Sequence, residues 1–134
     1  MIDYKKHLII TKSSLKVALS QLSKLGIDAI LFVVDAEDRL LGSITDGDVR
    51  RGLVAGIVID DVVDKIIREK PKYIIKGHYD LNQVIAYREE GFRIIPVLDK
   101  DHRVINIINF RSTYSYLPVD AVLMGGGKGL RLRP

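Results

Sequence analysis

The sequence of 134 residues lacks cysteine, tryptophan and any long apolar run. Without cysteine there is no disulfide framework, no thiolate zinc site and no cysteine nucleophile, and a reducing, cytoplasmic compartment is expected. The longest stretch free of charged residues has eight residues, whereas a membrane-spanning helix needs about 20 apolar ones. The first residues also lack the basic and then apolar pattern of a secretory signal. We therefore expect a cytoplasmic protein with no membrane partner.

Most of the excess positive charge lies in the last ten residues. The chain has 21 Lys and Arg against 17 Asp and Glu, a net charge of +4. Residues 125–134 contain three basic residues and no acidic one, so the preceding 124 residues have a net charge of only +1. A nucleic-acid-binding domain carries a clustered basic stripe, often with aromatic residues on which bases stack. Neither pattern is present, so we expect no nucleic-acid partner.

The sequence contains a repeat with a period of about 65 residues, recognised from apolar spacing and turn residues. In the first copy we expect strands over 8–10, 29–34 and 40–45 and helices over 15–25 and 46–55, with Ser13 as the N-cap of the first helix and Gly26 as its end. In the second copy we expect strands over 73–75, 94–98 and 104–109 and a helix that begins at Asp80. The turn aspartate precedes Gly42 by seven residues in one copy and Asn106 by seven residues in the other.

This repeat predicts an α/β fold, mixed in strand direction, built from two small three-stranded sheets with two or more helices each. A unit of about 60 residues buries only about 60% of its surface and is marginal alone. We therefore expect the two sheets to pack together, with repeat 1 over residues 1–66 and repeat 2 over residues 67–116.

The most specific local motif lies at residues 42–51, Gly-Ser-Ile-Thr-Asp-Gly-Asp-Val-Arg-Arg. A strand that ends at Thr45 and runs directly into a helix turns backbone N–H groups outward, which suits a phosphate. The Thr45 hydroxyl adds a donor, and Asp48 is placed to accept hydrogen bonds from a ribose diol. The same two residues also form the pattern of a capping box, which serves the helix alone. Arg50 and Arg51 are either phosphate partners or part of a solvated helix face.

The repeat and the Gly-x-x-Thr-x-x-Asp motif together resemble a cystathionine-β-synthase-type (CBS) domain pair, or Bateman module, over about residues 4–115. The resemblance implies two pseudo-twofold-related repeats, a homodimer, and an adenine or guanine nucleotide bound as an effector in the cleft between the repeats. It assigns phosphate binding to Thr45 and ribose binding to Asp48. It places the segments that contact the base near Ser13, Ala18, Asp28 and Ala29.

The second repeat departs from that motif. Asn106 stands in place of Gly42, Asn109 in place of Thr45, and Ser112 in place of Asp48. Without the carboxylate a ribose loses a charge-assisted hydrogen bond, worth about 1.5–3 kcal/mol. We therefore predict one competent site, on the first repeat.

The end of the chain, residues 117–134, carries a second motif. Its Gly-Gly-x-Gly-x-Arg-Leu-x-Pro pattern resembles the opening of sugar-phosphate nucleotidyltransferases of the mannose-1-phosphate guanylyltransferase kind. The resemblance assigns a nucleoside triphosphate loop to Gly126, Gly127, Lys128, Gly129 and Arg131. It implies a parent enzyme that joins a sugar 1-phosphate to a nucleoside triphosphate with Mg²⁺, and a chain truncated at the start of that domain. The alternative is a basic tail without fixed structure.

No complete active site is found in the sequence. The three histidines share no ligand-like spacing with carboxylates, so we expect no metal site, no required cofactor and no catalytic residue in this chain. The predicted function is a regulatory nucleotide-binding module attached to a nucleotidyltransferase. The alternative is a purely structural CBS pair that dimerises and binds no ligand.

Overall fold

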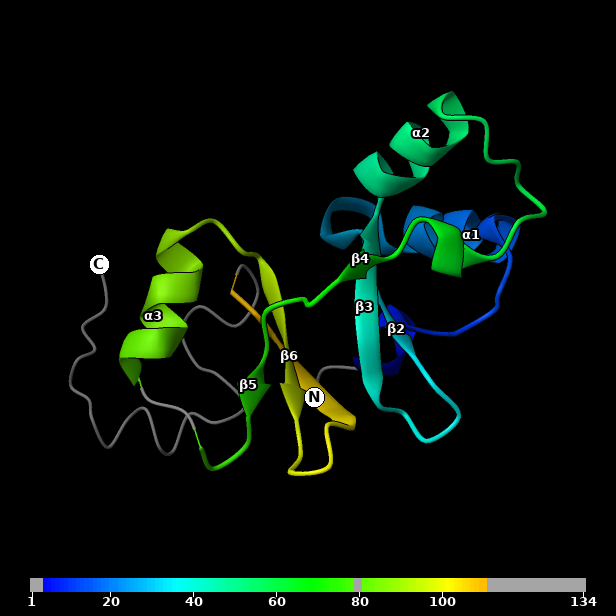
Figure 1. The fold of residues 1–134 in the computed structure, drawn as a ribbon. Coiled ribbons are helices and arrows are strands. Elements are labelled where there is room, and N and C mark those ends of the chain that lie inside the picture. Colours follow the sequence, from blue (N-terminus) through cyan, green and yellow to red (C-terminus); the bar gives the residue numbers. More distant parts are fainter. Residues whose placement is uncertain (1–3, 79–80, 111–134) are drawn as a thin grey trace.

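The computed structural model describes residues 4–78 and 81–110, which form two sheets with helices on their outer sides (Figure 1). The elements are η1 (Tyr4–His7), β1 (Leu8–Ile10), α1 (Leu15–Leu25), η2 (Gly26–Asp28), β2 (Ile30–Val34), β3 (Leu40–Thr45), α2 (Asp46–Val54), η3 (Val63–Lys65), β4 (Arg68–Glu69), β5 (Ile74–Ile75), α3 (Leu81–Glu89), β6 (Ile94–Leu98) and β7 (Val104–Asn109). Among these residues no helix is long and apolar enough to span a membrane.

The first sheet has the strand order β1-β2-β3-β4 and the second has the order β5-β6-β7. In each, the first strand pairs in parallel with the next, and the following pair is antiparallel. The three-stranded expectation is confirmed for the second sheet, and the first gains β4, which no sequence pattern had indicated. Both residues of β4 have exposed side chains, so its assignment depends on backbone pairing with β3 and not on an apolar run.

The strand registers confirm the repeat. Ile30 pairs with Thr45 in the first sheet, and Ile94 pairs with Asn109 at the same place in the second. Each antiparallel ladder also has a register shift at the corresponding position, near the end of its first strand. The local signals of both copies therefore produce the same strand geometry, although their sequences differ at many positions.

The two repeats meet at their hairpin turns. The Leu40 N–H donates to the His102 carbonyl at 3.0 Å, and the Val104 N–H donates to the Asp38 carbonyl at 2.9 Å. These two bonds join equivalent positions of the two copies and exchange donor and acceptor between them. That reciprocity is the pseudo-twofold relation expected from the resemblance.

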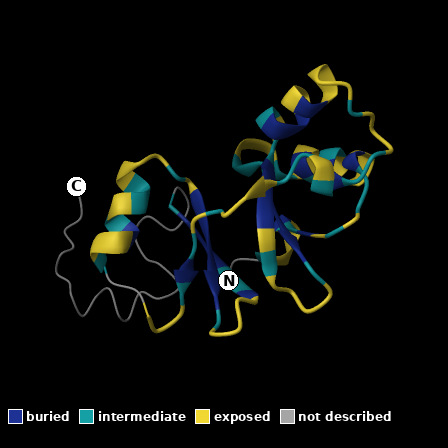
Figure 2. Ribbon diagram, viewed as in Figure 1, coloured by how far each residue is buried: buried dark blue, intermediate teal, exposed yellow. Residues whose placement is uncertain are grey.

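The core has an outer part under the helices and a central part between the sheets. Leu31 and Val33 of β2 pack under α1 and α2, whereas Phe32 packs against Ile94 and Ile107 of the second sheet. Because successive side chains of a strand point to opposite faces, β2 is apolar at every position and buried on both sides. Figure 2 shows buried strands at the centre and exposed residues on the helices and turns.

The structure corrects the expected cap of α1. The Ser14 side chain, and not that of Ser13, accepts from the Val17 N–H and forms the N-cap. The Ser13 hydroxyl instead donates to the Ile10 carbonyl at 2.7 Å. The helix itself begins at Leu15, as expected, and this first residue is fully buried. The expected end at Gly26 is confirmed, with a positive φ of 63°.

Candidate functional site at the start of helix α2

The predicted nucleotide motif lies where β3 passes into α2. Thr45 is extended and caps the helix, and the full capping box is present. The Asp48 N–H donates to Thr45 Oγ1 at 3.3 Å, and the Thr45 N–H donates to Asp48 Oδ2 at 3.0 Å. The Thr45 hydroxyl also donates to the same carboxylate oxygen at 3.1 Å. Thr45 and Asp48 therefore cap the helix, and a ligand at this site would contact side chains that already make hydrogen bonds in the capping box.

Two arginines hold the other oxygen of the Asp48 carboxylate. Arg51 Nη2 lies 2.7 Å from Asp48 Oδ1 and Arg68 Nη2 lies 3.3 Å from it. The Asp48 side chain is only 7% exposed, whereas those of Arg51 and Arg68 are 66% and 65% exposed. The site is thus a buried anionic centre with two cationic groups on its solvent side.

The Asp48 carboxyl group is charged at neutral pH. Burial raises its pKa, but hydrogen bonds from Arg51 and Thr45, together with the charge of Arg68, outweigh burial and place the pKa below the ordinary value. A charged carboxylate accepts hydrogen bonds at both oxygens. It is also favoured near the positive end of a helix.

Arg51 lies over the first turn of α2. A Cβ atom placed at Gly47 would be 3.2 Å from Arg51 Nη1, so glycine leaves room for this close approach. Arg50, the other arginine singled out in the sequence, is exposed on the same helix. Backbone N–H groups at a helix start and a guanidinium group beside them are the groups that bind phosphate oxygens. Chemically, the site suits recognition of an anion and of hydroxyl groups.

The structure brings some of the other predicted residues to this end of the sheet. Asp28 and Ala29 directly precede Ile30, which pairs with Thr45, so they lie near the motif. Ala18 is fully buried in the core and offers no surface to a ligand. Ser13 follows β1 at the opposite end of the sheet, because Ile10 pairs with the last residue of β2.

Two arginines that the sequence had not indicated also lie at the site or near it. Arg68 comes from β4, and its contact with Asp48 spans 20 residues. Arg93 comes from the second repeat and donates from Nη1 to the Ile27 carbonyl at 3.1 Å, next to Asp28. Alignment of the two copies would have placed Arg93 at the position of Ala29. No local pattern marks Arg68, since its position depends on pairing between strands.

The equivalent place in the second repeat is only partly described. Asn109 is buried at the position of Thr45, and Asn106 accepts from the N–H of its own neighbour, Ile107, at 2.9 Å. Ser112 and the predicted triphosphate loop at 126–131 lie outside the described residues. The prediction of a single competent site therefore stays a prediction.

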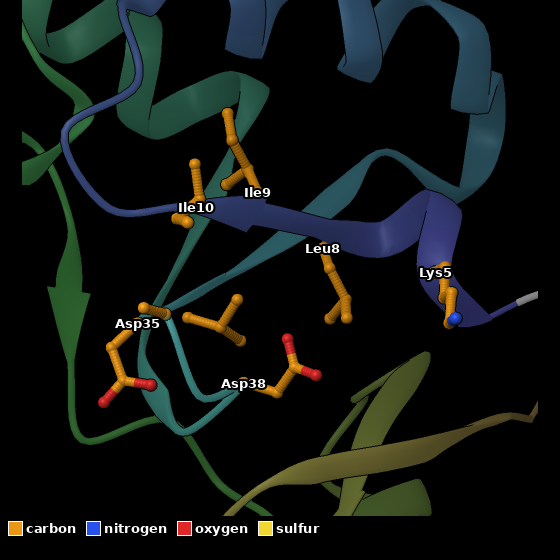
Figure 3. A pocket seen from close by; sticks show the side chains of 8 residues that line it. Lys5, Leu8, Ile9, Ile10, Asp35 and Asp38 are labelled. Atoms are coloured by element: carbon orange, nitrogen blue, oxygen red, sulfur yellow. The ribbon is translucent and has the colours of Figure 1, made fainter.

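A shallow hollow lies at the other end of the first sheet (Figure 3). It has a volume of about 330 Å³, and Leu8 and Ile10 of β1 line it together with Lys5, Asp35 and Asp38. The Asp35 carboxylate is already engaged by the N–H groups of its own turn and by Arg39. None of the residues predicted to bind a nucleotide lines this hollow. Within residues 4–78 and 81–110, no group of three or more potential ligands is arranged to hold a metal ion.

Residues 8–55 match the family model of the CBS domain. The whole described fold resembles the CBS domains of a transcriptional regulator from Streptococcus pneumoniae, with a TM-score of 0.65 and 14% identity over 81% of this chain and 87% of that one. The fold is that of a CBS-domain pair. The sequence-based fold prediction is thereby confirmed, including its two linked repeats.

Two further structures with a similar fold have bound nucleotides. A CBS domain protein from Pyrobaculum aerophilum, complexed with AMP, has a TM-score of 0.62 and 14% identity, covering 79% of this chain and 81% of that one. The cytosolic domain of the Mg²⁺ channel MgtE, in complex with ATP, has a TM-score of 0.63 and 19% identity, covering 81% and 43%. At these identities the likeness concerns the fold.

A curated relative is an uncharacterized protein of Chlamydia muridarum (strain MoPn / Nigg). It is 33% identical over 90 residues, which are 64% of this chain and 27% of that protein. The chain thus spans about a quarter of the length of the relative it matches. Neither this relative nor the three structures is named as a nucleotidyltransferase.

Proposed function

We propose that this CBS pair is a regulatory module that binds an adenine nucleotide at the start of α2. The observation that carries the proposal is the Asp48 carboxylate, which is buried and charged yet held on one side by two exposed arginine side chains. The complexes of similar folds with AMP and ATP support the choice of an adenine nucleotide. In this proposal Asp48 accepts from the ribose hydroxyls.

The phosphate position follows from the same turn. Thr45 supplies a hydroxyl and α2 supplies the N–H groups of its first turn, and Arg51 adds an exposed positive charge beside them. Asp28 and Ala29 lie at the same end of the sheet and are proposed to border the base. Ser13 and Ala18, which the resemblance also indicated, have no part in the proposal because of their positions.

The test is isothermal titration calorimetry with AMP, ADP, ATP, GTP and S-adenosylmethionine. We expect at least one adenine nucleotide to bind, and Asp48→Asn to weaken it about 10- to 100-fold, because a hydrogen bond to a charged group is worth about 1.5–3 kcal/mol. Asp46→Asn is the matched control, since Asp46 is an exposed acid in the same helical turn, and it should leave affinity unchanged. Absence of binding by all five compounds, or equal binding by both variants, contradicts the proposal.

The second candidate function is a structural module that dimerises. Large apolar side chains are exposed at the end of α2 and in the loop after it: Leu53 (40%), Val54 (85%), Val58 (57%) and Ile59 (44%). This loop lies beside α1, because the Lys16 N–H donates to the Ile59 carbonyl at 3.0 Å. A second copy of the chain, packed through these helices, would cover the apolar surface, as the resemblance to CBS pairs implies.

Light scattering at micromolar concentration tests the dimer. We expect a dimer for the unchanged chain and a monomer for Val54→Asp. Ile27→Asp is the control, because Ile27 is 63% exposed but lies in η2, on a different element. A monomeric unchanged chain, or equal effects of both variants, contradicts this candidate.

The regulated domain is proposed to be a sugar-phosphate nucleotidyltransferase. Its support is the Gly-Gly-x-Gly-x-Arg-Leu-x-Pro pattern at residues 126–134, which lies outside the described residues. The full-length gene product, supplied with Mg²⁺, a sugar 1-phosphate and a nucleoside triphosphate, should release pyrophosphate. No pyrophosphate with mannose 1-phosphate or other hexose 1-phosphates contradicts it.

A further inference from the structure

The Asp48 carboxylate connects the proposed nucleotide site to the crossover between the two repeats. We propose that a ribose bound at Asp48 displaces Arg68 and thereby loosens β4 and the crossover segment 70–72 that follows it. This inference rests on the proposed function, because it needs a nucleotide at Asp48. It goes further in naming how binding would reach the second repeat.

The first step concerns the capacity of the carboxylate. Asp48 Oδ2 accepts from the N–H and the hydroxyl of Thr45, and Oδ1 accepts from Arg51 and Arg68. A carboxylate has about four lone-pair positions for hydrogen bonds, and these four donors occupy them. A ribose hydroxyl that donates to Asp48 must therefore replace one of the donors already present.

The second step identifies the donor that is replaced. The Thr45 N–H bond belongs to the capping box, so removing it would disrupt the start of α2, and the Thr45 hydroxyl donates within the same turn at 3.1 Å. Arg51 stands one helical turn after Asp48, at 2.7 Å, whereas Arg68 comes from another element and lies at 3.3 Å. A charge-assisted N–H···O bond weakens as it lengthens beyond about 2.9 Å. Arg68 is therefore the most distant of the four donors, and it is the one that comes from outside α2 and its cap.

The third step concerns what Arg68 holds in place. Strand β4 has two residues and lies at the edge of the first sheet, where Arg68 pairs with Ser43 and Glu69 pairs with Gly42. Gly42 permits this approach, because a Cβ there would be 2.3 Å from the Ile67 side chain and 2.8 Å from the Arg68 carbonyl oxygen. Ile67 anchors the strand on its N-terminal side by packing against the core.

The crossover follows directly on the other side. Both residues of β4 have exposed side chains, so beyond Ile67 the strand has little apolar packing. Residues 70–72 then lead to β5, the first strand of the second sheet. In Figure 1 this segment is the green connection that runs from β4 to β5. Release of Arg68 from Asp48 would therefore loosen β4 where the chain leaves the first sheet for the second repeat.

Amide hydrogen exchange of the full chain, with AMP as the probe, tests the inference. Peptides over 46–54 and 66–72 report on α2 and on the crossover, and calorimetry in the same buffer reports binding. We expect AMP to slow exchange in 46–54 and to speed exchange in 66–72 by about two- to fivefold, the range set by loss of an exposed ion pair. In Arg68→Gln, exchange in 66–72 should already be fast without AMP and should not change when AMP binds.

The outcomes separate the two proposals. If AMP does not bind the unchanged chain, the proposed function fails. If AMP binds but exchange in 66–72 is unchanged or slower, the displacement of Arg68 is wrong while the nucleotide site stands. Loss of AMP binding in Arg68→Gln also overturns the displacement, because a side chain that leaves cannot be needed for affinity. Arg103→Gln, an exposed arginine on the turn after β6, is the control and should behave as the unchanged chain.

Discussion

Replacement of Asp48 by alanine should destabilise the fold clearly more than replacement of its neighbour Asp46. Asp48→Ala removes the acceptor of the half-buried Thr45 N–H, and a donor left without a partner there costs about 1–3 kcal/mol. It also removes a negative charge from the helix start, worth about 0.3–1 kcal/mol. The ion pairs with Arg51 and Arg68 add at most about 1 kcal/mol, because both arginines are mostly exposed. The expected total is about 2–4 kcal/mol.

Asp46→Ala isolates the charge at the helix start. Asp46 occupies the first turn of the same helix but is exposed, so only about 0.3–1 kcal/mol is expected. Urea unfolding followed by circular dichroism measures both variants, and at a slope of about 1–3 kcal/mol/M the midpoint of Asp48→Ala should fall by about 1 M or more. Equal losses in the two variants would refute the reasoning, since the capping box would then contribute no net stability.

Three further predictions concern acid, packing and the contact between repeats. Burial raises the pKa of Asp48 and of Asp64, but their hydrogen bonds outweigh burial, so both pKa values lie below the ordinary value of an aspartate. Both groups therefore stabilise the fold above about pH 4 and lose this contribution as the pH falls, so the urea midpoint should be lower at pH 3 than at pH 6. Gly42→Ala should lower the free energy of unfolding by about 1–3 kcal/mol, because the added Cβ crowds β4. Asn106→Ala changes the equivalent position of the second sheet, which has no described fourth strand, and should cost less. Equal losses of stability in the two variants would contradict this prediction. Phe32→Ala should cost about 3–5 kcal/mol, measured by thermal unfolding, and a loss below about 1 kcal/mol would show that the sheets do not share a core.

The repeat could be predicted because its signals are local. The strands at 40–45, 94–98 and 104–109 have the boundaries that the apolar runs indicated. The turn between the first pair is specified by Asp35, whose carboxylate accepts from two N–H groups within four residues of it. Asp99 repeats that arrangement. Such features need no distant partner, so they can be read from the order of residues.

The site could be predicted only in part. Thr45 and Asp48 are three residues apart, and their mutual hydrogen bonds follow from the geometry of a helix start. The spacing of Ala18 and its apolar neighbours predicts that Ala18 lies on the inner face of its helix. It does not predict that the side chain is completely buried and so closed to a ligand. Arg68 reaches Asp48 because β4 pairs with β3, and nothing in the sequence near Arg68 marks that pairing.

The sequence by itself determined the two copies, the turns and the charged cap of α2, because each depends on residues a few positions apart. Only the tertiary structure decided which charges meet at that cap and how the copies join. Arg68 and Asp48 come together through the strand pairing of β3 and β4, and the two hairpins come together through reciprocal backbone bonds. Those contacts depend on packing between distant segments, and strand pairing is sensitive to the register of the whole sheet.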